Sequence, residues 1–244
     1  MQHNTFLWWL AAVALTGMAA LTACWGVMAA RYYARLLDAG ACPDGTTLFR
    51  AWMRASRVMV PSIIRFRWRQ WVRALSMPGF WAGAALGTAV MLSNRALAEA
   101  LAILAVSLVL LWLGSIDIRT GLLPDALTQP VMWAGLAFAW VHGAEALAPA
   151  FAGVVVGYAV PAAMRGAWLW WRQHDALGYG DVKLLAGIGA WTGPHDVLHV
   201  LLLACLGAIV WAGIRYRGLA LHRVCPFGPF LSGSAIVWLM WPVR

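Results

Sequence analysis

Long apolar stretches, separated by short polar or basic connections, dominate the pattern of this chain. The first, Leu7–Ala30, carries no charge and exceeds the roughly 20 residues that a helix needs to cross a bilayer. Seven further apolar segments follow, at Gly79–Leu92, Leu97–Ile116, Pro130–Val141, Leu147–Trp171, Leu184–Thr192, Val197–Ile214 and Pro226–Val243. Several are shorter than a full span, but together they predict an all-α polytopic membrane helical bundle of about eight transmembrane helices.

Arginines indicate which connections face the cytoplasm. Nine of them lie between Arg31 and Pro78, and basic loops stay on the cytoplasmic side. The amino terminus is therefore expected outside. Counting crossings from there places the loops Asp117–Gln129, Arg172–Lys183 and Arg215–Arg223 in the cytoplasm, where their basic residues fit the same rule. Eight spans with both termini outside satisfy the charge distribution.

The Arg-rich connection also has an aromatic pattern. From Phe49 to Leu75, arginines alternate with Trp52, Phe66, Trp68 and Trp71, which is typical of an amphipathic helix lying on the anionic inner leaflet. Binding of RNA through Arg and aromatic stacking is the rival interpretation. Because basic loops are ordinary in membrane proteins, we favour the lipid bilayer as partner and expect no nucleic acid.

The composition excludes a soluble enzyme and argues against a metal site. Of the 244 residues, 63% are apolar and only 11% charged, which excludes a soluble globular enzyme. The four cysteines lie far apart without a Cys-x-x-Cys pair, so neither a disulfide framework nor a four-thiolate zinc site is indicated. His195 and His199 stand one helical turn apart, but they are expected on the external side without a third ligand. We therefore expect no metal site.

Two aspartates at the ends of apolar segments carry the candidate chemistry. Asp117 ends a strongly apolar helix, and Asp181 follows two glycines at the start of another. The crossing count puts both at cytoplasmic helix ends, so they can meet. Two carboxylates in a poorly solvated site share one proton, which is the arrangement of an aspartic protease. The sequence does not determine which of them is protonated.

Other roles for these acids stay open at this level. A helix cap is the plain alternative for Asp181, and a proton-coupled transporter subunit would use both acids as a relay. A transporter predicts acids spread across the membrane depth, whereas these cluster on one face. Gly178 and Gly180 suit the protease interpretation, because they permit unusual backbone angles and leave room for an extended substrate beside Asp181.

Three motifs together resemble a known family. They are Ile116 to Asp125, Gly178 to Ala186 with Gly189-Ala190-Trp191 behind it, and Pro226 to Leu231. In this order they resemble the type IV prepilin leader peptidases, polytopic aspartic proteases of the G-x-G-D class. The resemblance implies an endopeptidase of the bacterial inner membrane that removes the short basic leader of type IV prepilins or pseudopilins on the cytoplasmic side.

The resemblance also assigns residues. Asp117 and Asp181 become the catalytic pair. Gly178, Gly180, Lys183 and Asp125 belong to the substrate side of the site, with Asp125 read as a structural or helix-start carboxylate. Because the leaders are basic, we also consider Asp38, Asp44 and Asp175 as acids that receive them. A relative that cleaves another short-leader membrane protein is the alternative function.

The resemblance, together with the apolar and basic pattern, predicts three regions: a first transmembrane helix at 1–30, a cytoplasmic basic subdomain at 31–78 and the membrane peptidase domain at 79–244. In many relatives the second region methylates the new amino terminus with S-adenosylmethionine and holds two Cys-x-x-Cys pairs. Here Cys42 stands alone, with Gly45 in the partner position. Zinc is therefore not expected, peptidase activity needs no cofactor, and S-adenosylmethionine is needed only if methyl transfer is retained.

Overall fold

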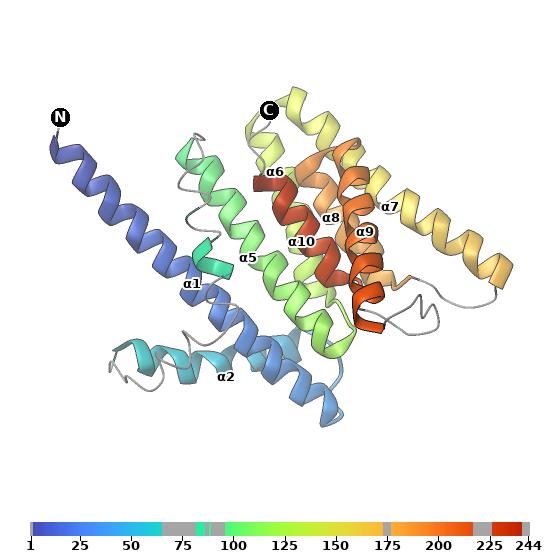
Figure 1. Ribbon diagram of the computed structural model, residues 1–244, viewed down its shortest axis with the longest axis horizontal. Coiled ribbons are helices and arrows are strands. Elements are labelled where there is room, and N and C mark those ends of the chain that lie inside the picture. Colours follow the sequence, from blue (N-terminus) through green and yellow to red (C-terminus); the bar gives the residue numbers. More distant parts are fainter. Residues whose placement is uncertain are drawn as a thin grey trace. The chain divides into compact units, whose positions relative to one another are not determined.

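The computed structural model describes residues 2–64, 82–85, 88, 96–172, 177–216 and 226–240. The named elements in these ranges are all α-helices (Figure 1): α1 Gln2–Asp38, α2 Gly45–Ile64, α5 Leu97–Thr120, α6 Asp125–Val141, α7 Ala144–Arg172, α8 Tyr179–Thr192, α9 Asp196–Tyr216 and α10 Gly228–Met240. The predicted all-α class is confirmed. They form two compact units, Met1–Arg119 with Met240–Arg244 and Thr120–Leu239.

Three helices are long and apolar enough to cross a membrane, at Ala98–Thr120, Ala144–Trp171 and Asp196–Arg215. Their residues carry large apolar side chains that stay exposed, as lipid-facing helices require. The chain is therefore a membrane protein. The predicted number of eight spans remains a prediction, because most of the predicted span Gly79–Leu92 lies outside the described residues.

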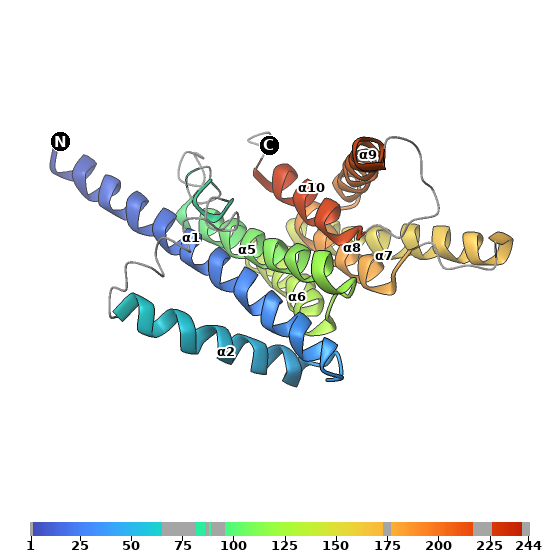
Figure 2. The same ribbon diagram turned by 60° about the horizontal axis from the view of Figure 1, so that its bottom comes forward.

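In the first unit, α2 packs along the carboxyl-terminal half of α1 (Figures 1 and 2). Leu48, Ala51 and Ala55 are buried at helical spacing, and on α1 the matching side chains include Ala30 and Tyr33, both 0% exposed. Small alanines allow the two helices to approach closely. The contact explains why α2 stays attached to α1 although it carries several arginines.

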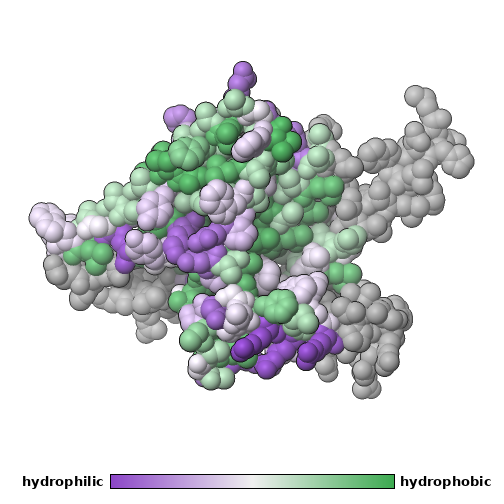
Figure 3. Space-filling view, turned by 180° about the vertical axis from the view of Figure 1, so that it is seen from behind, coloured by the Kyte–Doolittle hydropathy of each residue, from purple (hydrophilic) through white to green (hydrophobic). Residues whose placement is uncertain are grey.

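The outer face of α2 is amphipathic in the predicted way. Arg50, Arg54 and Arg57 are exposed, together with Phe49 and Met53, and hydrophilic side chains gather over α2 at the lower edge of Figure 3. The helix begins at Gly45, earlier than the predicted start at Phe49. The predicted stretch beyond Ile64 lies outside the described residues.

Asp44 explains where α2 begins. Its Oδ1 accepts a hydrogen bond from the backbone N–H of Thr47 at 2.8 Å, and its carboxylate accepts the Thr46 hydroxyl at 2.9 Å. These bonds satisfy backbone donors that a helix start leaves unpaired. The Thr47 N–H, and after it the two threonine side chains, hold the pKa of Asp44 below its ordinary value.

In the second unit, α8 is the central helix. It packs against α6, α7 and α9, and every residue from Leu184 to Ala190 is buried. Glycines make this possible, because a side chain at Gly157 would lie 2.6 Å from the backbone oxygen of Leu185, and one at Gly153 would collide with the backbone of Gly189. The indole of Trp191 also donates to the Val131 oxygen of α6 at 2.9 Å.

The loop predicted at Asp117–Gln129 is shorter in the structure, and its predicted boundaries were wrong. Helix α5 continues through Thr120 and α6 starts at Asp125, so only four residues lie between the two helices. Gly121 ends α5 with a φ of +63°, and Pro124 precedes α6 in extended conformation. Hydropathy marks the point where a helix leaves the membrane, whereas the turn is set by Gly and Pro.

Candidate active site

Asp117 lies in the last turn of α5, in the first unit. Its side chain is only 5% exposed, and the preceding Ile116 and Leu113 are 0% exposed. The next residues along the helix, Ile118 and Arg119, are exposed. Asp117 therefore points from an apolar helix towards the inside of the protein, although a carboxylate is among the groups most costly to bury.

Asp181 lies in the first turn of α8, in the second unit. Gly178 precedes the helix in extended conformation, with φ −64° and ψ 142°. Asp181 is half-buried, and the buried Val182 and Leu184 follow it. The carboxylate therefore lies at the start of α8, next to the buried residues of the same helix.

The two carboxylates have opposite positions in their helices. Free backbone N–H groups give the start of a helix a partial positive charge, and free carbonyls give its end a partial negative charge. The helix charge near Asp181 favours an ionised carboxylate, and the helix charge near Asp117 disfavours one. Burial of Asp117 acts in the same direction as its helix end.

The glycines before Asp181 are required for the space they leave, and they do not adopt unusual backbone angles. Neither Gly178 nor Gly180 has a positive φ, so the expectation of special backbone conformation is wrong. A Cβ on Gly180 would lie 2.8 Å from the Cβ of Leu123, and one on Gly178 would lie 3.2 Å from Oδ2 of Asp181. The room they leave is occupied by the turn before α6 and by the carboxylate itself.

Lys183 and Asp125 join the starts of two helices. The Lys183 Nζ donates a hydrogen bond to Oδ2 of Asp125 at 2.6 Å, with side chains 35% and 51% exposed. Asp125 is the first residue of α6, and Lys183 stands two residues after Asp181 on α8. The ion pair therefore ties the turn at Leu123 and Pro124 to the segment that carries Asp181.

Sequence reasoning missed two neighbours of this site on α7. The guanidinium of Arg165 lies over the ring of Tyr179 at 4.5 Å from its centroid, and Lys183 lies 6.0 Å from the same centroid. The side chain of Tyr158 lies close to that of Tyr179. Arg165 could have been found, because a charge inside the predicted span Leu147–Trp171 is a functional candidate by default.

Comparison with known proteins gives the family. Residues 103–213 match the model of the type IV leader peptidase family. Leader peptidase HopD of Escherichia coli is 40% identical over 135 residues, which are 53% of this chain and 83% of that relative. The chain belongs to the type IV leader peptidase family.

The chain covers its larger relatives only in part. The prepilin leader peptidase/N-methyltransferase of Aeromonas hydrophila is 39% identical over 143 residues, or 58% of this chain and 49% of the relative. The protein of that name in Escherichia coli strain K12 is 40% identical over 139 residues, or 54% of this chain and 60% of the relative. The chain thus spans about half the length of such relatives. No solved structure matches it.

The range that matches the family model contains the candidate site. Asp117, Asp125, Asp181 and Lys183 all lie within residues 103–213, as do Arg165 and Tyr179. Helices α1 and α2 lie before the matched range. Both helices are therefore separate in sequence from the matched range that contains the two aspartates.

The remaining sequence candidates have plainer surroundings. The ring of His199 stacks on Trp238 at 5.1 Å and lies 4.0 Å from Asp196, whereas His195 is exposed. Asp38 is the last residue of α1, and Asp44 caps α2. Asp175 lies outside the described residues. No group of three or more His, Cys, Asp or Glu side chains forms a metal site within the described ranges.

Proposed function

We propose that this chain is an aspartic endopeptidase that removes the short leader of type IV prepilins or pseudopilins, with Asp117 and Asp181 as its catalytic pair. Membership in the type IV leader peptidase family, at 40% identity to a leader peptidase, carries the proposal. The names of the larger relatives supply the substrate class. Two aspartates at helix ends inside the matched range supply the chemistry.

The proposed reaction uses one proton shared by two carboxyl groups. The ionised Asp181 removes a proton from water, and the resulting hydroxide attacks the carbonyl carbon of the scissile bond. The protonated Asp117 donates a hydrogen bond to the carbonyl oxygen and stabilises the negative charge that develops there. A proton then passes to the leaving nitrogen, and the C–N bond breaks. This chemistry requires neither a metal nor an organic cofactor.

This assignment of the two roles follows from the surroundings of each aspartate. Asp181 occupies a helix start, which favours a negative charge. Asp117 is 5% exposed at a helix end, which favours the neutral acid. Gly178, Gly180, Lys183 and Asp125 are proposed to shape the substrate side of the site.

We place the protein in the bacterial inner membrane, with both aspartates at the cytoplasmic surface. The basic connections favour this orientation. Cysteines introduced one at a time at Gly121 and Gly143, which lie in turns at opposite ends of α6, test it in spheroplasts when the four native cysteines are replaced by alanine. We expect a membrane-impermeant thiol reagent to label the Gly143→Cys variant alone. Labelling of Gly121→Cys alone would reverse the orientation.

Cleavage of a prepilin in membranes tests the activity. The wild-type chain should release a product whose amino terminus lies at the junction between the basic leader and the apolar helix. Membranes without the chain should release none. If the chain leaves prepilin uncut but cleaves a membrane protein with another kind of short leader, that protein class becomes the substrate in place of the prepilins.

Methyl transfer is a second candidate activity, because the relatives named for it are about 40% identical to this chain over the matched region. S-adenosylmethionine would then be the methyl donor. The mass of the mature product decides the matter, since one methyl group adds a fixed increment to the amino-terminal peptide. An unmethylated product formed in the presence of S-adenosylmethionine would limit the function to cleavage.

A further inference from the structure

Arg165 is a charged residue inside an apolar helix. It lies within the membrane-capable segment Ala144–Trp171, and it is partly buried, whereas its neighbours Met164 and Gly166 are exposed. Ionisable side chains are costly in such segments and indicate a functional site with a partner that can be named. The packing of α7 against the helix that carries Asp181 identifies one partner.

This packing brings Arg165 to the start of α8. The buried stripe of α7 has helical spacing and consists of Ala150, Gly153, Gly157 and Pro161. Gly153 lies against the backbone of Gly189, and the next member of the stripe lies against Leu185, so the two helices run antiparallel. Arg165 follows one turn after the stripe, and its guanidinium meets Tyr179, the first residue of α8.

The contact is that of a cation over an aromatic ring. The guanidinium carbon of Arg165 lies 4.5 Å from the centroid of the Tyr179 ring, and cations within about 6 Å of a centroid are attracted to the ring face. A guanidinium is planar and can stack on such a face, which an ammonium group cannot do. Tyr158, also on α7, lies close to Tyr179. Two side chains of α7 therefore contact this tyrosine.

Tyr179 is the point at which the segment before Asp181 can be held. This segment reads Gly178-Tyr179-Gly180, and its two glycines carry no side chain. Other helices can therefore hold it only through its backbone or through the tyrosine ring. Because Asp181 follows two residues later in the first turn of α8, a shift of the Tyr179 ring also shifts the carboxylate.

The start of α8 is attached on two sides. The ion pair of Lys183 with Asp125 joins it to α6, and the contact of Tyr179 with Arg165 joins it to α7. Asp181 lies between these two attachments in the sequence. A catalytic group has to be held within about 0.5 Å of its productive position, and attachment on two sides restricts the movement of a helix start more than attachment on one.

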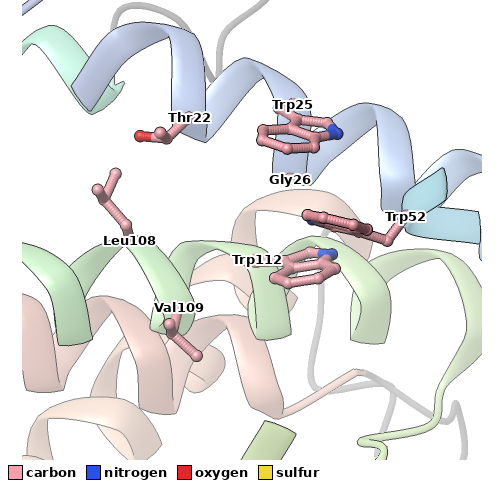
Figure 4. A pocket seen from close by; sticks show the side chains of 7 residues that line it. All are labelled: Thr22, Trp25, Gly26, Trp52, Leu108, Val109 and Trp112. Atoms are coloured by element: carbon pink, nitrogen blue, oxygen red, sulfur yellow. The ribbon is translucent and has the colours of Figure 1, made fainter. Parts of the chain in front are cut away.

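Rings elsewhere in the chain have a different environment. In the first unit, Trp25 and Trp52 stack with centroids 5.0 Å apart. Figure 4 shows the apolar pocket that they line together with Thr22, Gly26, Leu108, Val109 and Trp112. Contacts of this kind contribute to the interior of a protein. Tyr179 is instead 54% exposed, and its ring has two cations nearby, so burial alone does not account for its contact with Arg165.

We propose that Arg165 is a positioning residue of the peptidase, which holds the start of α8, and with it Asp181, against α7 through the ring of Tyr179. The importance of this contact for cleavage rests on the proposed function. The contact itself can be tested without a substrate.

Hydrogen exchange of the full chain in detergent is the test that needs no substrate. Arg165→Met keeps an unbranched side chain and removes the charge. The amides from Asp181 to Ala186 should then exchange roughly 2- to 30-fold faster, the range that corresponds to a cation–π contact, while α9 is unchanged. Tyr179→Leu should have the same effect, and the double variant should have no larger one. Tyr179→Phe keeps the ring and should exchange more slowly than Tyr179→Leu.

Cleavage of prepilin tests the consequence for Asp181. Arg165→Met should lower kcat by a similar factor, about 2- to 30-fold, and leave KM unchanged, because a displaced Asp181 impairs the reacting geometry and not the binding of substrate. Arg165→Lys keeps a cation near the ring without the planar group. It should therefore recover part of both kcat and the protection from exchange.

Two controls change exposed side chains of the same kinds. Arg54→Met on α2 removes an arginine, and Trp170→Leu on α7 removes a ring that is 86% exposed. Both should match the wild type in exchange and in cleavage. Unchanged exchange in Arg165→Met, faster exchange throughout α6 to α9, or a raised KM at constant kcat would each overturn the proposal. Absence of cleavage by the wild type would overturn the proposed function, and exchange would still decide whether Arg165 holds α8.

Discussion

Asp117 and Asp181 are the same residue type in one proposed reaction, yet their surroundings differ in almost every respect. Asp117 is buried in the last turn of a 24-residue apolar helix. Asp181 is half-buried in the first turn of a 14-residue helix, beside glycines and an ion pair. The comparison teaches that helix position and burial can divide the acid and base roles between chemically identical side chains.

The largest expected effect comes from removing either carboxylate. Asp181→Asn removes the base and should lower the rate of prepilin cleavage by at least 10²–10⁴-fold, the usual contribution of general acid–base catalysis. Asp117→Asn should also be severely impaired. Because an amide can still donate a hydrogen bond to the scissile carbonyl, its residual rate should exceed that of Asp181→Asn. Single-turnover cleavage in membranes measures both.

Normal accumulation of each variant is the control for these rates. Full activity of either Asn variant would contradict the aspartic mechanism. If the residual rate is higher in Asp181→Asn than in Asp117→Asn, then Asp117 is the base and Asp181 the acid. The roles inferred from the two helix ends would then be wrong.

A smaller effect is expected from filling the space beside Asp181. Gly180→Ala places a Cβ 2.8 Å from the Cβ of Leu123, and such overpacking typically costs about 1–3 kcal/mol. Displacement of Asp181 should lower kcat more than it raises KM. Gly166→Ala on α7 is the matched control, because a Cβ there meets nothing within 4 Å. Thermal unfolding in detergent and cleavage kinetics are the measurements, and equal behaviour of the two variants would refute the packing argument.

The ion pair of Lys183 and Asp125 should contribute less. Both side chains are partly exposed, and exposed pairs are worth about 0–1 kcal/mol. We expect Lys183→Met, Asp125→Asn and the double variant to give a coupling energy below about 1 kcal/mol in a thermodynamic cycle. A much larger coupling would show that the pair is part of the catalytic site itself.

The smallest effect is expected at Asp44, a carboxylate at a helix start that has no proposed catalytic role. Its pKa is lowered by the Thr47 N–H and the threonine side chains. The cap should therefore stabilise α2 fully above about pH 4, near the ordinary carboxyl pKa, and lose that effect as the pH falls through the lowered pKa. Hydrogen exchange of α2 amides should show this loss in wild type and a flatter profile in Asp44→Asn. Identical pH profiles in the wild type and Asp44→Asn would show that the Asp44 cap does not cause the loss of α2 stability.

The sequence by itself determined the class of protein and its family. Apolar periodicity predicted an all-α membrane protein, because the bilayer requires long runs of apolar side chains with internally bonded backbone. The motifs around Asp117 and Asp181 predicted the leader peptidase family because they are contiguous in sequence. The amphipathic character of α2 was also local, since alternating arginines and apolar residues define it at helical spacing.

Only the tertiary structure decided what lies beside these residues. Leu123 occupies the space left by Gly180, Lys183 binds Asp125, and Arg165 lies over Tyr179. In the other unit, Trp52 reaches Trp25 from a separate helix and helps to enclose a cavity. These contacts join segments far apart in the chain, and they depend on how helices approach and rotate against each other. Local periodicity specifies a helix and its apolar face, but the partner across that face is fixed by three-dimensional packing.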